Sequence, residues 1–179
     1  EASGISTTLK TIVPQLTDPD RLVVIADNCT DETAAIARQF GATVIERQDT
    51  ERQGKGYALD YGIQYLASDP PDIVVLVDAD CIVHEGAIAK LAQRANTSQR
   101  PTQAIYLLEQ PPNPTPKDTI SALSFRVKNL VRPRGLNQLG FPCLLTGTGM
   151  AFPWSVIRQA SLASNNIVED MQLGIDLAI

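Results

Sequence analysis

Short apolar runs alternate with amphipathic segments along the first part of the chain. Residues 22–26 and 73–77 are apolar runs of five, typical of strands buried on both faces of a sheet, and residues 43–46 form a shorter candidate strand. Between them, residues 30–40 and 57–66 carry apolar side chains at helical spacing. This alternation predicts right-handed crossovers and an α/β fold, a mainly parallel sheet flanked by helices in three α/β/α layers.

Local signals set the ends of the predicted helices. Apolar residues at helical spacing predict a first helix that closes at Pro14, and we expect Thr30 to cap the second helix and Gly41 to end it. A further helix over 86–95, a strand over 104–108 and a last helix over 171–179 complete the pattern. The residues that define the first helix are Ile5, Leu9 and Ile12.

The pattern changes after a proline-rich segment at residues 111–116. Residues 120–130 carry an apolar stripe at helical spacing with basic side chains around and after it. Two interpretations stay open, a surface helix packed on the sheet or a face turned towards an anionic membrane or an acceptor. The stripe consists of Ile120, Leu123, Val127 and Leu130, and the basic residues are Arg126, Lys128, Arg132 and Arg134.

Composition predicts one globular domain. The 179 residues are 44% hydrophobic and 20% charged, and a chain of this length buries a core without disulfides. Three widely spaced cysteines, Cys29, Cys81 and Cys143, indicate a reducing compartment and no zinc site. The uncharged run 135–157 is interrupted by Gly and Pro and is not expected to span a membrane.

Charge is unevenly distributed between the two parts of the chain. The net charge is −5, with 14 acidic and 6 basic residues in 1–80 against 6 acidic and 9 basic residues in 81–179. An acidic first part argues against nucleic acid as a partner. It suits a carboxylate site that holds a cation before it accepts a phosphate.

Acidic residues follow two of the predicted strands. Asp78 and Asp80 come directly after the run 73–77, and carboxylates one residue apart bind a hard cation while leaving positions open for water and phosphate. Asp27 follows the run 22–26, where a nucleobase or a ribose would need an acceptor. Turn capping is the alternative interpretation of these carboxylates.

Three further segments carry candidate chemistry. Lys55 lies between two glycines near a helix start and suits a nucleotide's negative charge, although the segment is not a Walker A loop. Residues 147–149 read Gly-Thr-Gly but lack the third glycine of a dinucleotide fingerprint. Glu169 and Asp170 open the last helical pattern, where a catalytic role competes with ordinary capping.

Taken together, five ordered motifs resemble those of the inverting family 2 glycosyltransferases, in particular bacterial members related to cellulose and hyaluronan synthases. The resemblance spans nearly the whole chain, and five motifs in order are more specific than any one of them. The motifs are ADNCTD at 26–31, GKGYAL at 54–59, VDAD at 77–80, TGTGM at 146–150 and VED at 168–170.

The resemblance implies a GT-A fold and a role for each motif. Carried over by position, Asp170 is the general base and Glu169 its neighbour. Asp80 ligates Mg²⁺ or Mn²⁺, and Asp78, at the same metal site, approaches the ribose or a metal-bound water. The donor-binding and acceptor-side residues are Asp27 at the base, Lys55 near the nucleotide, and Gly147, Thr148 and Gly149 towards the acceptor.

The same resemblance implies the reaction and the partners. A sugar, expected from a UDP-sugar, is transferred with inversion to a glycan or lipid-linked acceptor, at the cytoplasmic side and with membrane attachment in the whole protein. Residues 1–110 would form the nucleotide-sugar half and 111–179 the acceptor and catalytic-base half of one domain. The family's first strand and its Q-x-x-R-W motif would lie outside the chain, so that the domain is truncated at both ends.

Two other functions remain open. A sugar nucleotidyltransferase shares the sheet architecture and a metal-binding aspartate, but it gives Glu169 and Asp170 no natural role. A non-catalytic nucleotide-sugar-binding module would keep the metal and nucleotide residues and lack turnover. Metal-dependent nucleotide binding without transfer would distinguish that module from the enzyme.

Overall fold

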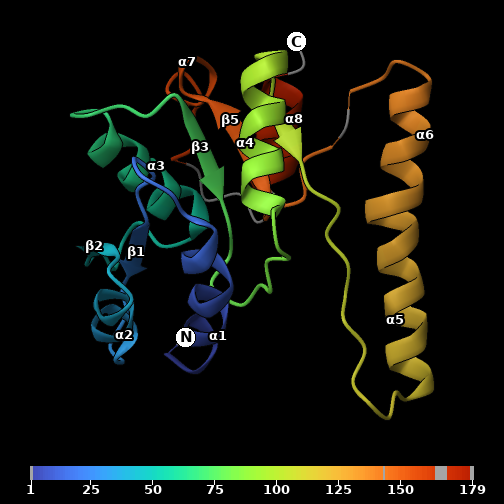
Figure 1. Cartoon of the computed structure of the whole chain (residues 1–179), viewed down its shortest axis with the longest axis horizontal. Coiled ribbons are helices and arrows are strands. Elements are labelled where there is room, and N and C mark those ends of the chain that lie inside the picture. The colour runs from blue at the N-terminus through green and yellow to red at the C-terminus, as the bar shows by residue number, and fades with distance from the viewer. Residues whose placement is uncertain (1, 143, 164–168, 178–179) are drawn as a thin grey trace.

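The computed structural model describes residues 2–142, 144–163 and 169–177 and contains two sheets with helices around them (Figure 1). Strands β1 (Val23–Asp27) and β2 (Thr43–Arg47) pair in parallel. Strand β5 (Met150–Pro153) lies between β3 (Ile73–Leu76) and β4 (Thr102–Gln103) and is antiparallel to both. The helices are α1 (Ala2–Ile12), α2 (Thr33–Gln39), α3 (Lys55–Leu66), α4 (Ala87–Ser98), α5 (Pro116–Arg126), α6 (Arg132–Gln138), α7 (Trp154–Ile157) and α8 (Glu169–Asp176).

The two-stranded sheet is covered on one side by α1 and α2. Ile5 and Leu9 of α1, each 2% exposed, pack with Ala37 of α2 and with Val24 and Val44 of the strands. Helix α3 also packs on β1 and extends to the second sheet. The apolar spacing of α1 therefore marks a helix face that is buried against the sheet.

The three-stranded sheet has a different cluster on each face. Val74 and Phe152 point to one face and pack with α3 and with Leu173 of α8. On the other face Ala151 packs with Leu91 and Ala95 of α4. Because neighbouring strand residues alternate between faces, this sheet forms the middle of three α/β/α layers, as predicted.

The α/β class is confirmed, and the strand pairing refines it. The predicted parallel pairing is found between β1 and β2. The third predicted strand, β3, pairs instead with β5, which runs back from the second half of the chain. Local sequence identifies a strand, but its partner depends on which distant segment lies beside it.

Two local predictions are wrong. Thr30 does not cap α2, because the helix begins at Thr33, where the Asp31 carboxylate accepts from the backbone N–H of Thr33 at 3.1 Å. Residues 104–108 form no strand: β4 ends at Gln103, and Tyr106 packs edge-on against Phe125 of α5 with ring centroids 5.7 Å apart. The prediction for Gly41 holds, since it follows α2 with φ of +78°.

The second half of the chain contains one long, nearly continuous helix. Helix α5, a π-helical turn over Val127–Val131 and α6 follow one another without a break, and we call residues 116–138 the long helix. Thr115 and Asp118 form a capping box at its start. The long helix stands to one side of the sheets (Figure 1). Among the described residues, no helix is long and apolar enough to cross a membrane.

Candidate active site

Lys55 joins three segments that are far apart in the sequence. Its ammonium forms an ion pair with the Asp78 carboxylate and donates a hydrogen bond to the Gly147 carbonyl at 2.6 Å. Lys55 begins α3, Asp78 follows β3, and Gly147 precedes β5. The side chains of Lys55 and Asp78 are 34% and 38% exposed, so the pair is open to a ligand from solvent.

Asp170 approaches the same place from α8. A methyl group added to Gly147 would lie 3.3 Å from Asp170 Oδ2 and 3.6 Å from Lys55 Nζ. Gly147 also has φ of +85°, a conformation that residues with a Cβ rarely adopt. The glycine therefore leaves room for a cation and a second carboxylate beside its backbone. Glu169 begins α8, but its side chain lies outside the described part of the structure.

Buried polar groups hold the Asp78 loop in place. The Thr148 hydroxyl, 4% exposed as a residue, accepts a hydrogen bond from the backbone N–H of Asp78 at 3.0 Å. Gln103 of β4 donates to the Thr148 carbonyl at 2.8 Å and accepts from the Thr146 N–H at 2.9 Å. The hydroxyl of Thr8 in α1 donates to the Ala79 carbonyl at 2.7 Å. Helix α1 and the turn before β5 thus hold the loop that carries the acidic pair, and β4 holds that turn.

Asp80 is exposed and lies beside a half-buried thiol. The Sγ of Cys81 is 3.8 Å from Asp80 Oδ1 and 3.3 Å from the hydroxyl of Thr148. Burial, followed by the charges of Asp78 and Asp80, raises the pKa of Cys81. The thiol therefore stays protonated near neutral pH, and the sulfur is a poor candidate for a nucleophile or a metal ligand.

The two carboxylates fit a magnesium or manganese ion whose remaining ligands come from a diphosphate and water. The described residues contain no group of three or more His, Cys, Asp and Glu side chains that could hold a metal by themselves. Mg²⁺ is usually bound by one or two carboxylates together with substrate phosphates and water. Asp78 and Asp80 supply that number of carboxylates, with Asp80 open to solvent.

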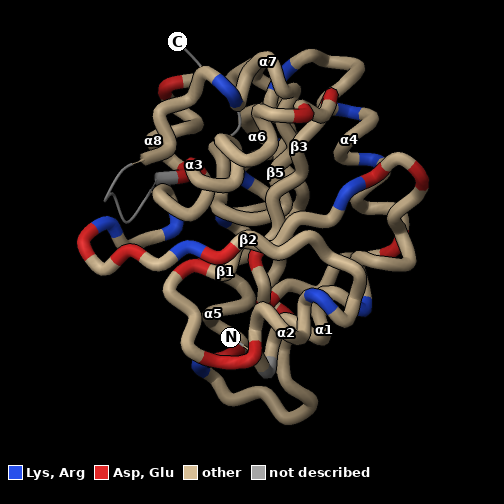
Figure 2. Tube along the Cα trace, turned by 90° about the vertical axis from the view of Figure 1, so that its left-hand side faces the viewer, with Lys and Arg blue, Asp and Glu red and all other residues tan. Residues whose placement is uncertain are grey.

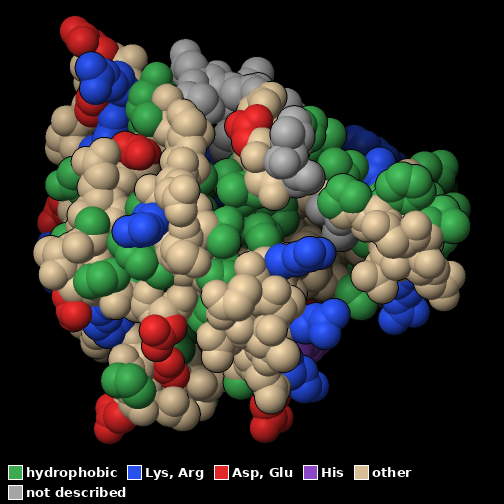
Figure 3. All heavy atoms as spheres, turned by 90° about the horizontal axis from the view of Figure 1, so that it is seen from above, with side chains coloured by type: hydrophobic (Ala, Val, Ile, Leu, Met, Phe, Trp, Pro, Cys, Tyr) green, Lys and Arg blue, Asp and Glu red, His purple; other side chains and the backbone are tan. Residues whose placement is uncertain are grey.

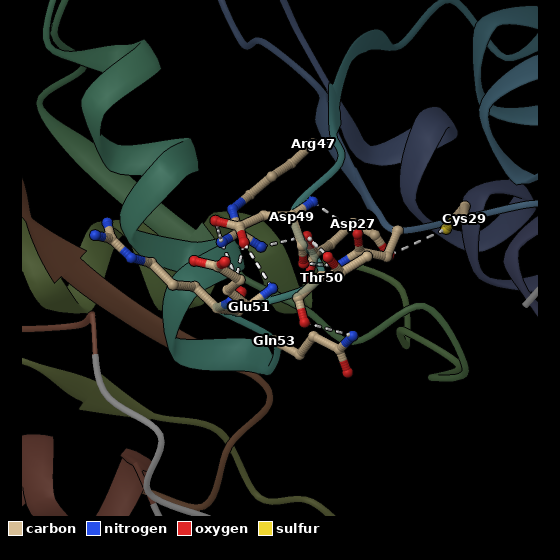
Figure 4. Close-up of polar contacts among 9 residues, drawn as sticks. Asp27, Cys29, Arg47, Asp49, Thr50, Glu51 and Gln53 are labelled. Atoms are coloured by element: carbon tan, nitrogen blue, oxygen red, sulfur yellow. Dashed lines mark hydrogen bonds and ion pairs between the residues drawn. The ribbon is translucent and has the colours of Figure 1, made fainter.

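Asp27 belongs to a second polar cluster. Its carboxylate accepts from Arg47 Nη1 at 2.7 Å, and Arg47 Nη2 lies 3.0 Å from Asp49 Oδ2 (Figure 4). Asn28, with φ of +52°, accepts from the Asp49 N–H at 2.8 Å and links the ends of β1 and β2. The hydrogen bond that Arg47 donates to Asp27 raises the pKa of Arg47, and the hydrogen bond from the Arg52 N–H is the main cause of a lowered pKa at Asp49.

A polar hollow adjoins this cluster. It has a volume of about 380 Å³ and is lined by Arg47, Arg52, Tyr57 and Tyr61 among others. The guanidinium of Arg47 lies 5.8 Å from the centre of the Tyr57 ring. The segment from β2 to α3 carries acidic and basic positions close together along the trace (Figure 2). Paired charges and aromatic rings beside a hollow suit a polar, planar ligand.

The structure brings most of the predicted site residues together, in two clusters. Lys55, Asp78, Gly147, Thr148 and Asp170 meet at one edge, with Asp80 in the same loop, whereas Asp27 lies in the Arg47 cluster. Gly149 continues the turn, and its carbonyl accepts from the Ala104 N–H at 2.7 Å.

Sequence reasoning missed the positions of Arg47 and Gln103. Arg47 ends β2 beside Asp27, and since parallel strands end at the same edge, its place directly after the run 43–46 was a usable signal. Gln103 had none, because its contacts with Thr146 and Thr148 join strands that are distant in sequence.

The fold places the chain in a class of protein. Its α/β/α arrangement is the GT-A fold of nucleotide-diphospho-sugar transferases. A family model described as "Glycosyltransferase like family 2" matches residues 1–179, and the chain belongs to that family. No curated protein matches the chain.

Solved structures with the same fold include glucosyl-3-phosphoglycerate synthase from Mycobacterium tuberculosis. The complex with uridine diphosphate is 25% identical with a TM-score of 0.58, and the complex with Mn²⁺, UDP-glucose and phosphoglyceric acid is 26% identical with a TM-score of 0.57. In both comparisons the match covers 88% of this chain and 54% of the other. The chain therefore spans about half the length of these relatives.

Proposed function

We propose that this chain contributes the catalytic domain of an inverting glycosyltransferase that transfers a sugar from a UDP-sugar to an acceptor hydroxyl. Membership of glycosyltransferase-like family 2 supports the reaction class. The UDP, UDP-glucose and Mn²⁺ bound by the synthase from Mycobacterium tuberculosis support the donor and the metal. The single observation that carries the proposal is the convergence of Lys55, Asp78 and Asp170 around Gly147.

In the proposed reaction each carboxylate has one task. Asp170 accepts the proton of the attacking hydroxyl as general base, with Glu169 as its neighbour. Asp78 and Asp80 would hold Mg²⁺ or Mn²⁺, and the ion would supply positive charge for the diphosphate. Lys55 pairs with Asp78 and would add a fixed positive charge at the phosphate side.

The nucleoside would occupy the side of the Arg47 cluster. Asp27 accepts from the base, and Arg47 holds the Asp27 carboxylate in one orientation through the 2.7 Å contact. Residues 1–110 supply Asp27, Lys55 and the Asp78 loop as the donor half. Residues 111–179 supply Gly147, Thr148, Gly149 and Asp170 as the acceptor half. The proposed acceptor is a glycan or lipid-linked hydroxyl on the cytoplasmic side, where nucleotide sugars are made.

Calorimetric titration of the chain with UDP, with and without Mn²⁺, tests the donor site. We expect binding that requires Mn²⁺ and that Asp80→Asn weakens by at least about tenfold, because one carboxylate ligand is removed. Asp72→Asn, an exposed change just before β3, is the matched control and should bind as the unaltered chain does. A folded chain without Mn²⁺-dependent UDP binding would contradict the proposal.

A UDP-release assay with UDP-glucose tests the base. Asp170→Asn should lower turnover about 10²- to 10⁴-fold while the affinity for UDP stays within about twofold, because the amide cannot accept the proton. Asp176→Asn, on the same helix, is the control. Unchanged turnover in Asp170→Asn would remove it as the base. UDP binding without any turnover by the whole protein would favour a binding module, and pyrophosphate release from a nucleoside triphosphate would favour a nucleotidyltransferase.

A further inference from the structure

The long helix carries an apolar stripe on the side that faces solvent. Ile120, Leu123, Val127 and Val131 follow one another at intervals of three, four and four residues, which places them on one helix face. They are 66%, 62%, 52% and 61% exposed in the same order. Val131 replaces the predicted Leu130, which is half-buried, and from here on we call Ile120, Leu123, Val127 and Val131 the apolar stripe. A soluble surface rarely leaves such a row of large apolar side chains open to water.

The opposite face of the long helix is already occupied. Ala122 and Asn129 are 6% and 5% exposed, and Phe125 packs against Tyr106 of the segment that leads into the helix. The helix therefore uses one face for contact with its own chain and leaves the apolar stripe for something else. Beyond its end, Leu139 and Phe141 are 72% and 59% exposed and add to the apolar surface.

Basic side chains accompany the apolar stripe. Residues 116–138 contain five basic residues and one acidic residue, whereas the whole chain has a net charge of −5. In the view from above, the lobe formed by the long helix shows hydrophobic and basic side chains side by side (Figure 3). The basic residues are Lys117, Arg126, Lys128, Arg132 and Arg134, and the acidic one is Asp118.

Charge complementarity identifies the occupant. Two copies of a helix with this excess of positive charge would repel each other if their apolar stripes met, so self-association is disfavoured. A helix of 23 residues, about 35 Å long, with apolar residues on one face and a basic margin, has the composition of helices that lie in the headgroup region of anionic bilayers. Each basic side chain near such a surface adds to the attraction.

We propose that the long helix docks on an anionic lipid surface, with the apolar stripe buried at the boundary of the acyl chains and the basic residues among the headgroups. The helix lies in the plane of the surface and does not span it. The long helix contains none of the candidate active-site residues, such as Lys55 and Asp170. Binding to lipid can therefore be tested separately from sugar transfer.

Vesicle flotation of the whole chain tests the proposal. We expect binding to phosphatidylcholine vesicles that contain one-third phosphatidylglycerol, and little binding to pure phosphatidylcholine. Lys128→Glu with Arg132→Glu should weaken binding more than about 25-fold, because each lost basic charge accounts for about fivefold. Leu123→Ser with Val127→Ser should weaken it at least about tenfold through lost apolar burial.

Matched variants separate docking from general effects. Lys90→Glu with Arg94→Glu reverses two exposed charges on α4, and Tyr65→Ser removes an exposed apolar ring on α3, and both should still float. Circular dichroism checks that every variant is folded. The proposal would be overturned if the chain failed to float with anionic vesicles or if all variants floated equally. It would also be overturned if sedimentation showed a dimer that Leu123→Ser with Val127→Ser dissociates, because the apolar stripe would then bind a second copy of the chain.

Discussion

Helix α1 and the long helix both carry apolar residues at helical spacing, but the row is buried in α1 and exposed in the long helix. Ile5, Leu9 and Ile12 of α1 are 2%, 2% and 7% exposed. Ile120 and Leu123 of the long helix are 66% and 62% exposed. Both rows were recognisable from sequence as helical stripes. The difference teaches that periodicity predicts a helix and its apolar face, while burial of that face depends on what packs against it.

The two helices differ in their neighbours. Helix α1 packs with α2 against the strands β1 and β2, and Thr8 connects it to the loop of the acidic pair. The long helix is reached through residues 104–115, which include three prolines, and it stands beside the sheets (Figure 1). The first helix therefore supports the candidate site, and the second is a surface element.

Leu9→Ala should have the largest effect on stability. Removing a buried leucine leaves a cavity between α1 and the strands, and the free energy of unfolding should fall by about 2–5 kcal/mol. Urea denaturation followed by circular dichroism measures the change. A loss below about 1 kcal/mol would mean that α1 is not an integral part of the core.

Thr8→Val should cost less and act closer to the site. The change keeps the shape of the side chain but leaves the Ala79 carbonyl without its 2.7 Å hydrogen bond, which costs about 1–3 kcal/mol. Because Ala79 lies between Asp78 and Asp80, we also expect weaker Mn²⁺-dependent UDP binding. Thr7→Val, at an exposed position on α1, is the control for both measurements.

Thr115→Ala should destabilise the long helix alone. Loss of its side chain from the capping box costs about 1 kcal/mol at the first turn. Hydrogen exchange should therefore be faster in α5 and unchanged in α1. Equal acceleration in both helices would show that the long helix unfolds together with the body of the domain.

The same cap should lose its effect in acid. Hydrogen bonds from Thr115 lower the pKa of Asp118, so the carboxylate stabilises α5 at every pH above its unfolded pKa of about 3.9. The contribution is lost as pH falls through the lower folded pKa. Between pH 5 and 8, the Asp118 carboxylate should contribute equally to the protection of α5 against hydrogen exchange. Protection should fall in acid, and Asp118→Asn should abolish that fall.

Leu123→Ala should have the smallest effect. Its side chain is 62% exposed, so truncation should change the free energy of unfolding by less than about 0.5 kcal/mol in the absence of lipid. Urea denaturation of Leu123→Ala and Leu9→Ala under the same conditions compares the two helices directly. A loss comparable to that of Leu9→Ala would show that the apolar stripe is covered within the chain.

The residues of the candidate site could be identified from sequence where a polar side chain follows a strand end. Asp27, Asp78 and Asp80 were identified because apolar runs precede them, and Lys55 because glycines flank it near a helix start. The pairing of Asp27 with Arg47 and the bracing of Asp78 by Thr148 were not predicted. They depend on distances between segments that the order of residues does not contain.

By itself, the sequence determined the helices and strands with strong periodicity, the α/β class, and the carboxylates and lysine that form the candidate site. Tertiary structure alone decided that β5 inserts between β3 and β4, that Lys55 and Asp170 both lie close to Gly147, and that the apolar stripe faces outward. The reason is physical. Spacing and capping act between residues a few positions apart, whereas strand partners and burial are set by the best available packing among all segments of the chain.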